Sequence, residues 1–417
     1  MREMKDSGIE WIGQIPKDWD VVPHKRVMHK VKKICEQYSG EDIISLTMNG
    51  VIKRDLTAGG KMPTSFDGYQ YVKPNDLLLC LFDIDVTPRC VGVVKDYGVT
   101  SPAYSRFVMH DGYYNAYYDY LLRAIDDDKV FVHLSKNLRS SLTESDFGAI
   151  KTCVPSLAEQ KRIVTFLDAQ CAEIDAVLEK TRASIEEYKK LKQAVITQAV
   201  TKGIRGDRPM KDSGIEWIGE IPAEWDVIRV KQLLKERNER SKEGKEEPLS
   251  MSQKVGLVPT KFLESIPNMA SSFVGAKLAY VDDLVFNKLK AHLGVFSVSR
   301  YDGLVSPDYA VYCSTGKSNL KYLEYIFKTP QCIGEFRKKS TGIAAGLMRL
   351  YTEGLFSIYL PYPALSEQEE IAEYLNEKCA GIDALIVKKQ QYLTEIENYK
   401  KSLIYEYVTG KKEVLPL

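Results

Sequence analysis

The sequence lacks a long apolar run, an excess of charge of either sign and any closely spaced pair of cysteines. Its 417 residues carry 58 Lys and Arg against 57 Asp and Glu, a net charge of +1, and 44% of them are hydrophobic. Without about 20 consecutive apolar residues there is no candidate for a transmembrane helix, and residues 1–6 are too polar to begin a signal peptide. We therefore expect a soluble, cytoplasmic protein of several globular domains that does not contact a membrane.

Motifs for catalysis and metal binding are missing as well. The eight cysteines, at positions 35, 80, 90, 153, 171, 313, 332 and 379, include no CxxC pair, so we expect small buried side chains rather than metal ligands or disulfides. The five histidines show no paired ligand spacing, and the sequence has no GxGxxG loop, HExxH motif or methyltransferase tetrad. The stretch 314–318 ends like a phosphate loop but has Val311 where that pattern needs glycine, which predicts a turn. We expect neither an active site nor a bound cofactor in this chain.

What the sequence does contain is a long internal repeat. Residues 4–21 and 210–227 are identical at 15 of 18 positions, at an offset of 206. Residues 155–201 and 363–409 are identical at 17 of 47 positions, at an offset of 208. The stretches between these anchors diverge much further. A period of half the chain indicates a duplicated domain-sized unit rather than a solenoid. Each half therefore consists of two repeated segments and, between them, a diverged segment that we call the insert.

The second anchor of each half predicts a long α-helix. Apolar residues recur there at steps of three and four, which is typical of a coiled-coil seam, and a helix of about 40 residues would be roughly 60 Å long. Thr181 and Lys389 interrupt the seams at equivalent positions, and Ser156 with Glu159 predicts a capping box. The predicted seams are Ile163, Leu167, Cys171, Ile174, Leu178, Ile185, Tyr188, Leu191, Val195 and Ala199, and then Ile371, Leu375, Cys379, Ile382, Ile386, Leu393, Ile396, Leu403 and Tyr407.

The linkers predict how the two helices meet. The second copy of the tryptophan motif starts only about ten residues after the first helix ends, so the second insert must lie near that end. We therefore predict an antiparallel helix pair with one insert at each end, related by an approximate twofold axis. The alternative is a helical hairpin inside one compact domain.

The inserts predict mixed α/β modules that share one fold. Apolar runs at 77–82, 90–94, 283–286 and 294–298 favour strands, and 117–124 and 320–327 suit short helices. The predicted fold class is thus α/β (α+β), with two similar mixed α/β domains separated by a pair of long antiparallel coiled-coil helices. The predicted segments are 1–154, 155–205, 206–362 and 363–417.

Cationic residues in predicted loops of the inserts are candidates for contact with a polyanion such as DNA. Residues 226–362 contain 20 Lys and Arg against 14 Asp and Glu, about +6, whereas the first insert is near neutral. For any one of these residues, a merely solvated charge is the alternative. The candidates are Lys53, Arg54, Lys61, Arg89 and Arg106 in the first insert, and Lys288, Lys290, His292, Arg337, Lys338, Lys339 and Arg349 in the second.

Three groups of motifs resemble the specificity subunit of type I restriction-modification systems. They are Ser-Gly-x-x-Trp-x-Gly-x-Ile-Pro-x-x-Trp at Ser7 and Ser213, Pro-x-Leu-x-Glu-Gln at Pro155 and Pro363, and the run from Tyr301 to Tyr309. The resemblance covers the whole chain. It implies two target-recognition domains (1–154 and 206–362), each reading one half of a bipartite double-stranded DNA target, and two conserved spacer helices (155–205 and 363–417). It also implies methyltransferase subunits, two in number, and restriction subunits as partners, with S-adenosylmethionine, ATP and Mg on those partners and a non-catalytic role for this chain.

Two assignments stay open in the sequence. The repeated Trp11, Trp19, Trp217 and Trp225 could stack on bases, but their identical context in both halves favours packing that seats each insert on the helices. The pairs Glu159-Gln160 and Glu367-Gln368 could cap the helices or face the methyltransferase. A coiled-coil scaffold or adaptor that binds no DNA is the rival function, and a fused enzyme would need a catalytic domain for which the chain leaves no room.

Overall fold

The computed structural model describes residues 2–48, 50–57, 63–87, 89–135, 140–253, 255–263, 272–342 and 348–414. The chain divides into two compact units: unit 1 comprises Met1–Arg182 and Gln391–Leu417, and unit 2 comprises Ala183–Gln390. Each unit contains one insert and a part of both long helices. The units therefore cut across the helices, whereas the predicted segments assign each helix to a segment of its own.

Unit 1 is built around a four-stranded antiparallel sheet with the strand order β4-β11-β8-β9. These strands are Met28–Lys30, Ser105–Met109, Leu77–Leu79 and Val91–Val93. The sheet packs against the helix α1 (Asn115–Asp127), and α2 (Val130–Leu134) and α3 (Glu144–Ala149) follow. Four two-stranded pairs complete the unit: β1 with β2 (Met4–Asp6, Gln14–Pro16), β3 with β12 (Asp20–Pro23, Lys151–Val154), β5 with β6 (Ile44–Thr47, Gly50–Lys53) and β7 with β10 (Gln70–Val72, Gly98–Thr100).

Unit 2 repeats this arrangement of strands pair by pair. Its four-stranded sheet has the order β16-β23-β20-β21 (Leu234–Arg237, Tyr309–Ser314, Leu284–Asn287, Phe296–Val298). The two-stranded pairs are β13 with β14 (Met210–Asp212, Glu220–Pro222), β15 with β24 (Asp226–Arg229, Tyr359–Tyr362), β17 with β18 (Leu249–Ser252, Gly256–Pro259) and β19 with β22 (Lys277–Ala279, Gly303–Val305). Its helices are α5 (Val230–Leu233), α6 (Leu320–Phe327), α7 (Pro330–Lys339) and α8 (Thr352–Phe356). The prediction that both inserts share one fold is confirmed.

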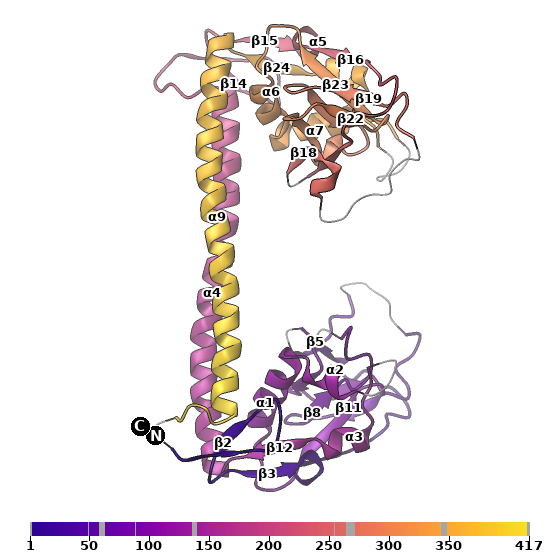
Figure 1. Ribbon diagram of the computed structural model, residues 1–417, viewed down its shortest axis with the longest axis vertical. Helices are drawn as coiled ribbons and strands as arrows, with labels where there is room; N and C mark the ends of the chain where they lie inside the picture. Colours follow the sequence, from indigo (N-terminus) through magenta and orange to yellow (C-terminus); the bar gives the residue numbers. More distant parts are fainter. Residues whose placement is uncertain are drawn as a thin grey trace. The chain divides into compact units, whose positions relative to one another are not determined.

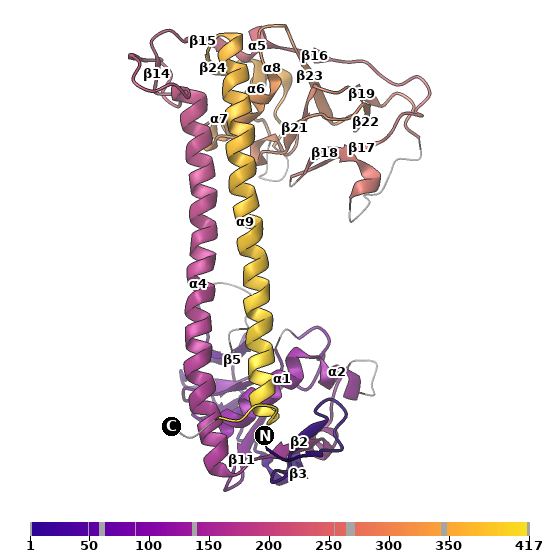
Figure 2. The ribbon, with the colours of Figure 1, turned by 60° about the vertical axis from the view of Figure 1, so that its left-hand side comes forward.

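The long helices are α4 (Leu157–Lys202) and α9 (Leu365–Val408), and within each unit the parts of the two helices lie side by side and run antiparallel (Figures 1 and 2). In unit 1 Lys400 forms an ion pair with Asp175 at 2.6 Å, and in unit 2 Lys192 pairs with Asp383 at 2.6 Å. Adding 208 to Asp175 gives Asp383, and adding 208 to Lys192 gives Lys400. The same ion pair therefore occurs in both units. In unit 1 the aspartate belongs to α4 and the lysine to α9, whereas in unit 2 the aspartate belongs to α9 and the lysine to α4.

Most of the predicted seam is buried, including Leu167, Leu178, Leu375 and Leu403. Leu191 is an exception, since 49% of its surface is exposed, and the neighbouring Ile196 is buried instead. Here α4 packs on the core of unit 2, around Trp225, so the buried face follows that core rather than a strict heptad seam.

The predicted burial of the cysteines is found for all but one of them. Seven of the eight are buried, Cys313 is partly exposed, and all eight are free. Among the described residues, no helix combines the length and the apolar composition that crossing a bilayer requires.

Candidate functional site

A cluster of three side chains holds the N-terminal tryptophan motif of unit 1 to the start of α4. Trp19 is only 1% exposed, and its indole Nε1 donates a hydrogen bond to Glu159 Oε2 at 3.0 Å. Arg2 reaches the other carboxylate oxygen of Glu159 at 2.5 Å and lies 5.8 Å from the indole ring. The hydrogen bond that Arg2 donates to Glu159 raises the pKa of Arg2 above its ordinary value despite the opposing effect of burial. We call Arg2, Trp19 and Glu159 the clamp of unit 1.

Unit 2 contains the same clamp, formed by Arg208, Trp225 and Glu367. Trp225 Nε1 donates to Glu367 Oε2 at 2.9 Å, and Arg208 pairs with Glu367 Oε1 at 2.6 Å. Trp225 is as deeply buried as Trp19. A buried indole offers no face to a nucleic acid base, so the two inner tryptophans serve packing. Trp11 and Trp217 are half-buried at the edges of the same two cores.

The glutamine beside each clamp glutamate fastens the insert to the long helix. Gln160 Nε2 donates to the carbonyl of Pro155 at 2.9 Å, and its Oε1 accepts from the backbone N–H of Tyr114, just before α1, at 2.8 Å. Gln368 does the same with Pro363 at 3.0 Å and with Asn319, just before α6, at 2.9 Å. Both glutamine side chains are fully buried.

The Glu-Gln pairs thus lie at the interface between each insert and a long helix, and of the two predicted roles the structure shows only part of the helix cap. Ser156 Oγ accepts from the backbone N–H of Glu159 at 3.3 Å, which is one half of a capping box. The Glu159 carboxylate does not close the box, because it is taken up by Trp19 and Arg2. Since these buried groups already have partners within the chain, they are not the surface that a methyltransferase would meet.

The end of the other long helix completes each joint. In unit 1 the Tyr117 hydroxyl donates to the carbonyl of Val408 at the end of α9, at 2.8 Å. In unit 2 the Tyr322 hydroxyl donates to the carbonyl of Val200, near the end of α4, at 3.3 Å. A glycine at positive φ follows each helix, and a side chain at Gly410 would clash with Pro16 and Trp19. Each insert is thus attached to the start of one long helix and to the end of the other.

The candidate DNA-binding residues of the first insert have unequal environments. Lys53 is exposed and pairs with Asp42 at 2.7 Å, and Arg54 and Arg89 are half-buried. Lys61 lies outside the described residues. Arg106 is only 7% exposed; it pairs with Asp76 at 2.6 Å and donates to the carbonyl of Tyr71 at 3.0 Å.

Arg106 is therefore a structural residue, and its prediction as a DNA contact is corrected. Asp283 of unit 2 corresponds to Asp76 and takes its arginine, Arg237, from another strand, at 2.8 Å. A buried carboxylate thus requires a cationic partner in both inserts, whichever strand supplies it.

Most candidates of the second insert are accessible. Lys290, Arg337 and Lys339 are exposed, and Lys338 is exposed beside Glu335, at 2.7 Å. His292, by contrast, is only 8% exposed, in the short turn that packs against α7, so its prediction as a DNA contact is corrected.

Lys288 and Arg349 come together although they are 61 positions apart in the chain, because the backbone N–H of Leu350 donates to the carbonyl of Lys288 at 3.0 Å. Burial, followed by the nearby Lys277, lowers the pKa of Lys288. Arg349 pairs with Asp308 at 3.3 Å. Lys288 and Arg349 are thus both half-buried and belong to neighbouring segments.

The arginines of the two clamps were missed in the sequence, although a signal was available. Arg2 and Arg208 differ by 206, the offset of the tryptophan motif, so the repeat extends two residues before Met4. Tyr117 and Tyr322 are also equivalent, at an offset of 205. A single tyrosine in a diverged insert gives no sign that it reaches a helix end almost 300 residues away.

No family model matches the chain. Curated relatives match it over much of its length. A Methanocaldococcus jannaschii protein, named as the candidate MjaX specificity subunit of a type I restriction enzyme, is 24% identical over 97% of this chain and 96% of its own. The MjaVIII specificity subunit of the same organism is 25% identical over 64% of this chain and 63% of its own.

Two solved structures share the fold. One, from work on complex assembly and conformational transition of the type I R-M system, has a TM-score of 0.71 at 13% identity and covers 95% of this chain and 99% of its own. The HsdS subunit from Thermoanaerobacter tengcongensis has a TM-score of 0.54 at 14% identity and covers 95% and 98%. Identities this low establish the fold, and the curated relatives confirm the resemblance that the repeated motifs indicated.

Proposed function

We propose that this chain is the DNA-recognition subunit of a type I restriction-modification system, in which each insert reads one half of a bipartite, asymmetric target. One curated relative, which matches 97% of this chain, is named as the candidate specificity subunit of a type I restriction enzyme. The observation that carries the proposal is the contrast within the molecule. The clamps and glutamine contacts are the same in both units, whereas the inserts share a fold but not their surface residues.

Identical joints around unlike inserts suit a reader of two different half-sites. The common joints would hold each insert in the same orientation on the helix pair, and the unlike loops would contact different bases. The exposed cations Lys290, Arg337 and Lys339 are candidates for phosphate or guanine contacts. Lys53, Arg54, Arg89, Lys288, Lys338 and Arg349 would contribute after rearrangement of their ion pairs or partial burial.

Catalysis would belong to the partners. We propose two methyltransferase subunits that carry S-adenosylmethionine, and restriction subunits that carry ATP and Mg, around a specificity subunit without a cofactor or reaction of its own. The continuous helices α4 and α9 would set the spacing between the two half-sites. With a net charge of only +1, the lone chain should bind DNA weakly, because phosphate neutralisation supplies most of the affinity.

The test is a methylome of cells that express this chain with its methyltransferase. We expect methylation at one bipartite motif with a fixed spacer. Replacing residues 226–362 with the second insert of another specificity subunit should change one half of the motif and leave the other half and the spacer as they were. Absence of any bipartite motif, or a change in both halves, would overturn the proposal.

The rival function is a scaffold that binds partners but no DNA. Nothing in a scaffold requires two inserts of one fold with different cationic surfaces. Electrophoretic shifts with random duplex DNA, with and without the methyltransferase, separate the two functions: a scaffold gives no shift in either case, whereas we expect a salt-sensitive shift that strengthens when the partner is present.

A further inference from the structure

The exposed surface near the start of each long helix differs in charge between the two units, being basic on α4 in unit 1 and acidic on α9 in unit 2. The buried positions of the long helices repeat faithfully, as the clamps show, but the exposed ones beside them do not. All eight of the following side chains are exposed. At an offset of 208, unit 1 has Lys161, Arg162, Thr165 and Ala169, where unit 2 has Glu369, Glu370, Glu373 and Glu377.

In unit 1 the basic pair borders an apolar groove. A groove of about 660 Å³ is lined by Phe166, Tyr407 and Val414, and the charged residues at its wall are Lys161, Arg162 and one carboxylate, Glu413. The Phe166 and Tyr407 rings are 4.4 Å apart. In the part of the chain that the structure describes, neither Lys161 nor Arg162 forms an ion pair. They also lie near the start of α4, where the helix dipole favours acidic rather than basic side chains, so helix stability does not explain them.

In unit 2 the corresponding surface is acidic. Tyr374 replaces Phe166, and Ala199 replaces Tyr407, so one of the two rings is lost. Glu370 pairs with Arg205 at 2.7 Å, but Glu369, Glu373 and Glu377 have no ion pair among the described residues. Like charges four positions apart on a helix destabilise it by about 0.2–0.5 kcal/mol per pair.

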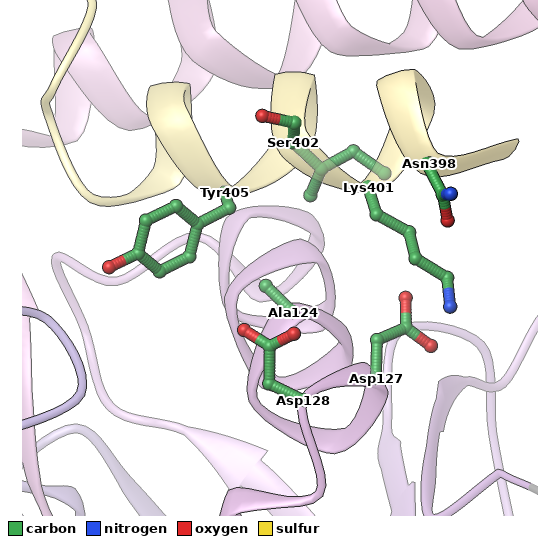
Figure 3. A pocket seen from close by; sticks show the side chains of 8 residues that line it. Ala124, Asp127, Asp128, Asn398, Lys401, Ser402 and Tyr405 are labelled. Atoms are coloured by element: carbon green, nitrogen blue, oxygen red, sulfur yellow. The ribbon is translucent and has the colours of Figure 1, made fainter. Parts of the chain in front are cut away.

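A second pair of related clefts also differs in charge between the units, but in the opposite sense, because here the carboxylates belong to unit 1. In unit 1 a cleft of about 340 Å³ between α1 and α9 is lined by Asp127, Asp128 and Lys401, with Lys401 extending toward Asp127 (Figure 3). A cleft of about 600 Å³ in unit 2 is lined by α4 residues that correspond in part, since Lys190, Gln193, Ala194 and Thr197 are equivalent to Asn398, Lys401, Ser402 and Tyr405. That cleft contains Lys190 and Lys202 and no carboxylate among its lining residues.

We infer that the two units bind their methyltransferase copies with unequal affinity, and that the first copy binds at the groove of unit 1. This inference rests on the proposed function. Two copies of one partner present the same surface, and no single surface is complementary to Lys161 and Arg162 in one unit and to Glu369 and Glu370 in the other. The groove fits a partner segment with an apolar face and acidic side chains beside it, since the apolar lining takes the first and the two cations take the second.

Titration of the purified chain with its methyltransferase, followed by native mass spectrometry, separates the binding of the first copy from that of the second. For Lys161→Glu with Arg162→Glu, we expect the first dissociation constant to rise about tenfold at low salt and the difference from the unaltered chain to shrink at high salt. Lys180→Glu, an exposed charge reversal on α4 outside the groove, should leave both steps unchanged. Circular dichroism melts check that each variant folds.

A transfer of residues tests the inference in the opposite direction. Glu369→Lys with Glu373→Thr and Glu377→Ala gives unit 2 the residues of unit 1 at three of the four positions and leaves Glu370 paired with Arg205. We expect the second dissociation constant to fall severalfold toward the first.

Each outcome decides. Equal dissociation constants for the two copies, or constants that neither set of substitutions alters, would overturn the inference. The proposed function would still stand in that case if the complex methylates a bipartite motif. If no complex with the methyltransferase forms at all, the proposed function fails. If the chain alone forms oligomers that Lys161→Glu with Arg162→Glu dissolves, the groove binds the acidic face of a second copy instead.

Discussion

Removing the carboxylate of one clamp should destabilise one unit and leave the other intact. In Glu367→Ala, the buried Trp225 indole loses the one acceptor it has among the described residues, and Arg208 loses its closest carboxylate there. Glu159→Ala makes the equivalent change in unit 1. The two variants are matched controls for each other, because the same three groups are altered in two places.

The magnitude follows from the burial of the cluster. Breaking a buried ion pair by removing one partner costs about 3–5 kcal/mol, and leaving a buried donor unsatisfied costs about 1–3 kcal/mol, contributions that overlap here. Arg208 keeps a second carboxylate, Glu224, at 2.7 Å. We therefore expect the lower end, about 3 kcal/mol, for Glu367→Ala. Glu367→Gln keeps an acceptor for the indole and loses only the charge, so about 1–2 kcal/mol is expected.

The assay must resolve the two units, because unfolding of a chain of this size is not two-state. Hydrogen exchange with mass spectrometry does so. For Glu367→Ala we expect exchange in 210–228 and 359–375 to accelerate about a hundredfold, since 1.4 kcal/mol corresponds to a factor of ten, with 4–22 unchanged. Glu159→Ala should give the reverse pattern. An acceleration below threefold, or an equal one in both units, would refute the reasoning.

Three further predictions concern acid stability, structure and DNA binding. Burial lowers the pKa of His24 to about 4. An unfolded histidine has a pKa near 6.5, so the free energy of unfolding of unit 1 should fall by about 1.4 kcal/mol per pH unit between about pH 6.5 and pH 4. In urea unfolding, His24→Gln should reduce this dependence on pH. Arg106→Met should lower the melting temperature of the complex but leave the salt dependence of DNA binding unchanged, because this arginine is internal. Lys290→Ala and Lys339→Ala should each reduce the slope of log affinity against log salt by about 1 in binding titrations, alike for all sequences; an unchanged slope would remove that lysine from the interface.

Much of the fold could be predicted from the hydrophobic periodicity and the internal repeat of the sequence. The seam from Ile163 to Ala199 predicted α4, and the short linker after it predicted that α9 runs back antiparallel, as the ion pairs of Lys400 and Lys192 confirm. Residues 320–327 were predicted as a helix and form α6 (Leu320–Phe327). These features depend on neighbours in the sequence or on a short connection, so they can be read without knowledge of distant contacts.

Individual site residues were predicted less well. A lysine or arginine in a polar stretch reads the same whether it faces solvent or a buried carboxylate, and for this reason Arg106 was taken for a DNA contact. Glu159 has the spacing of a capping box, but the arrival of Trp19 from 140 positions away offers its carboxylate a stronger use. His292 follows a cationic run, and only the packing of its turn on α7 places it inside.

The sequence by itself determined that the chain has two like halves, each with a long helix and a diverged insert, because duplication and helical periodicity are written in the order of residues. Only the tertiary structure decided what the repeated residues do and how the halves differ. Glu159 and Gln160 became the joint between insert and helix, since their partners lie 46 to 157 positions away. The sequence shows that Lys161 is replaced by Glu369 in the second half. Only the structure shows that Lys161 lies beside an apolar groove and Glu369 on an exposed acidic surface.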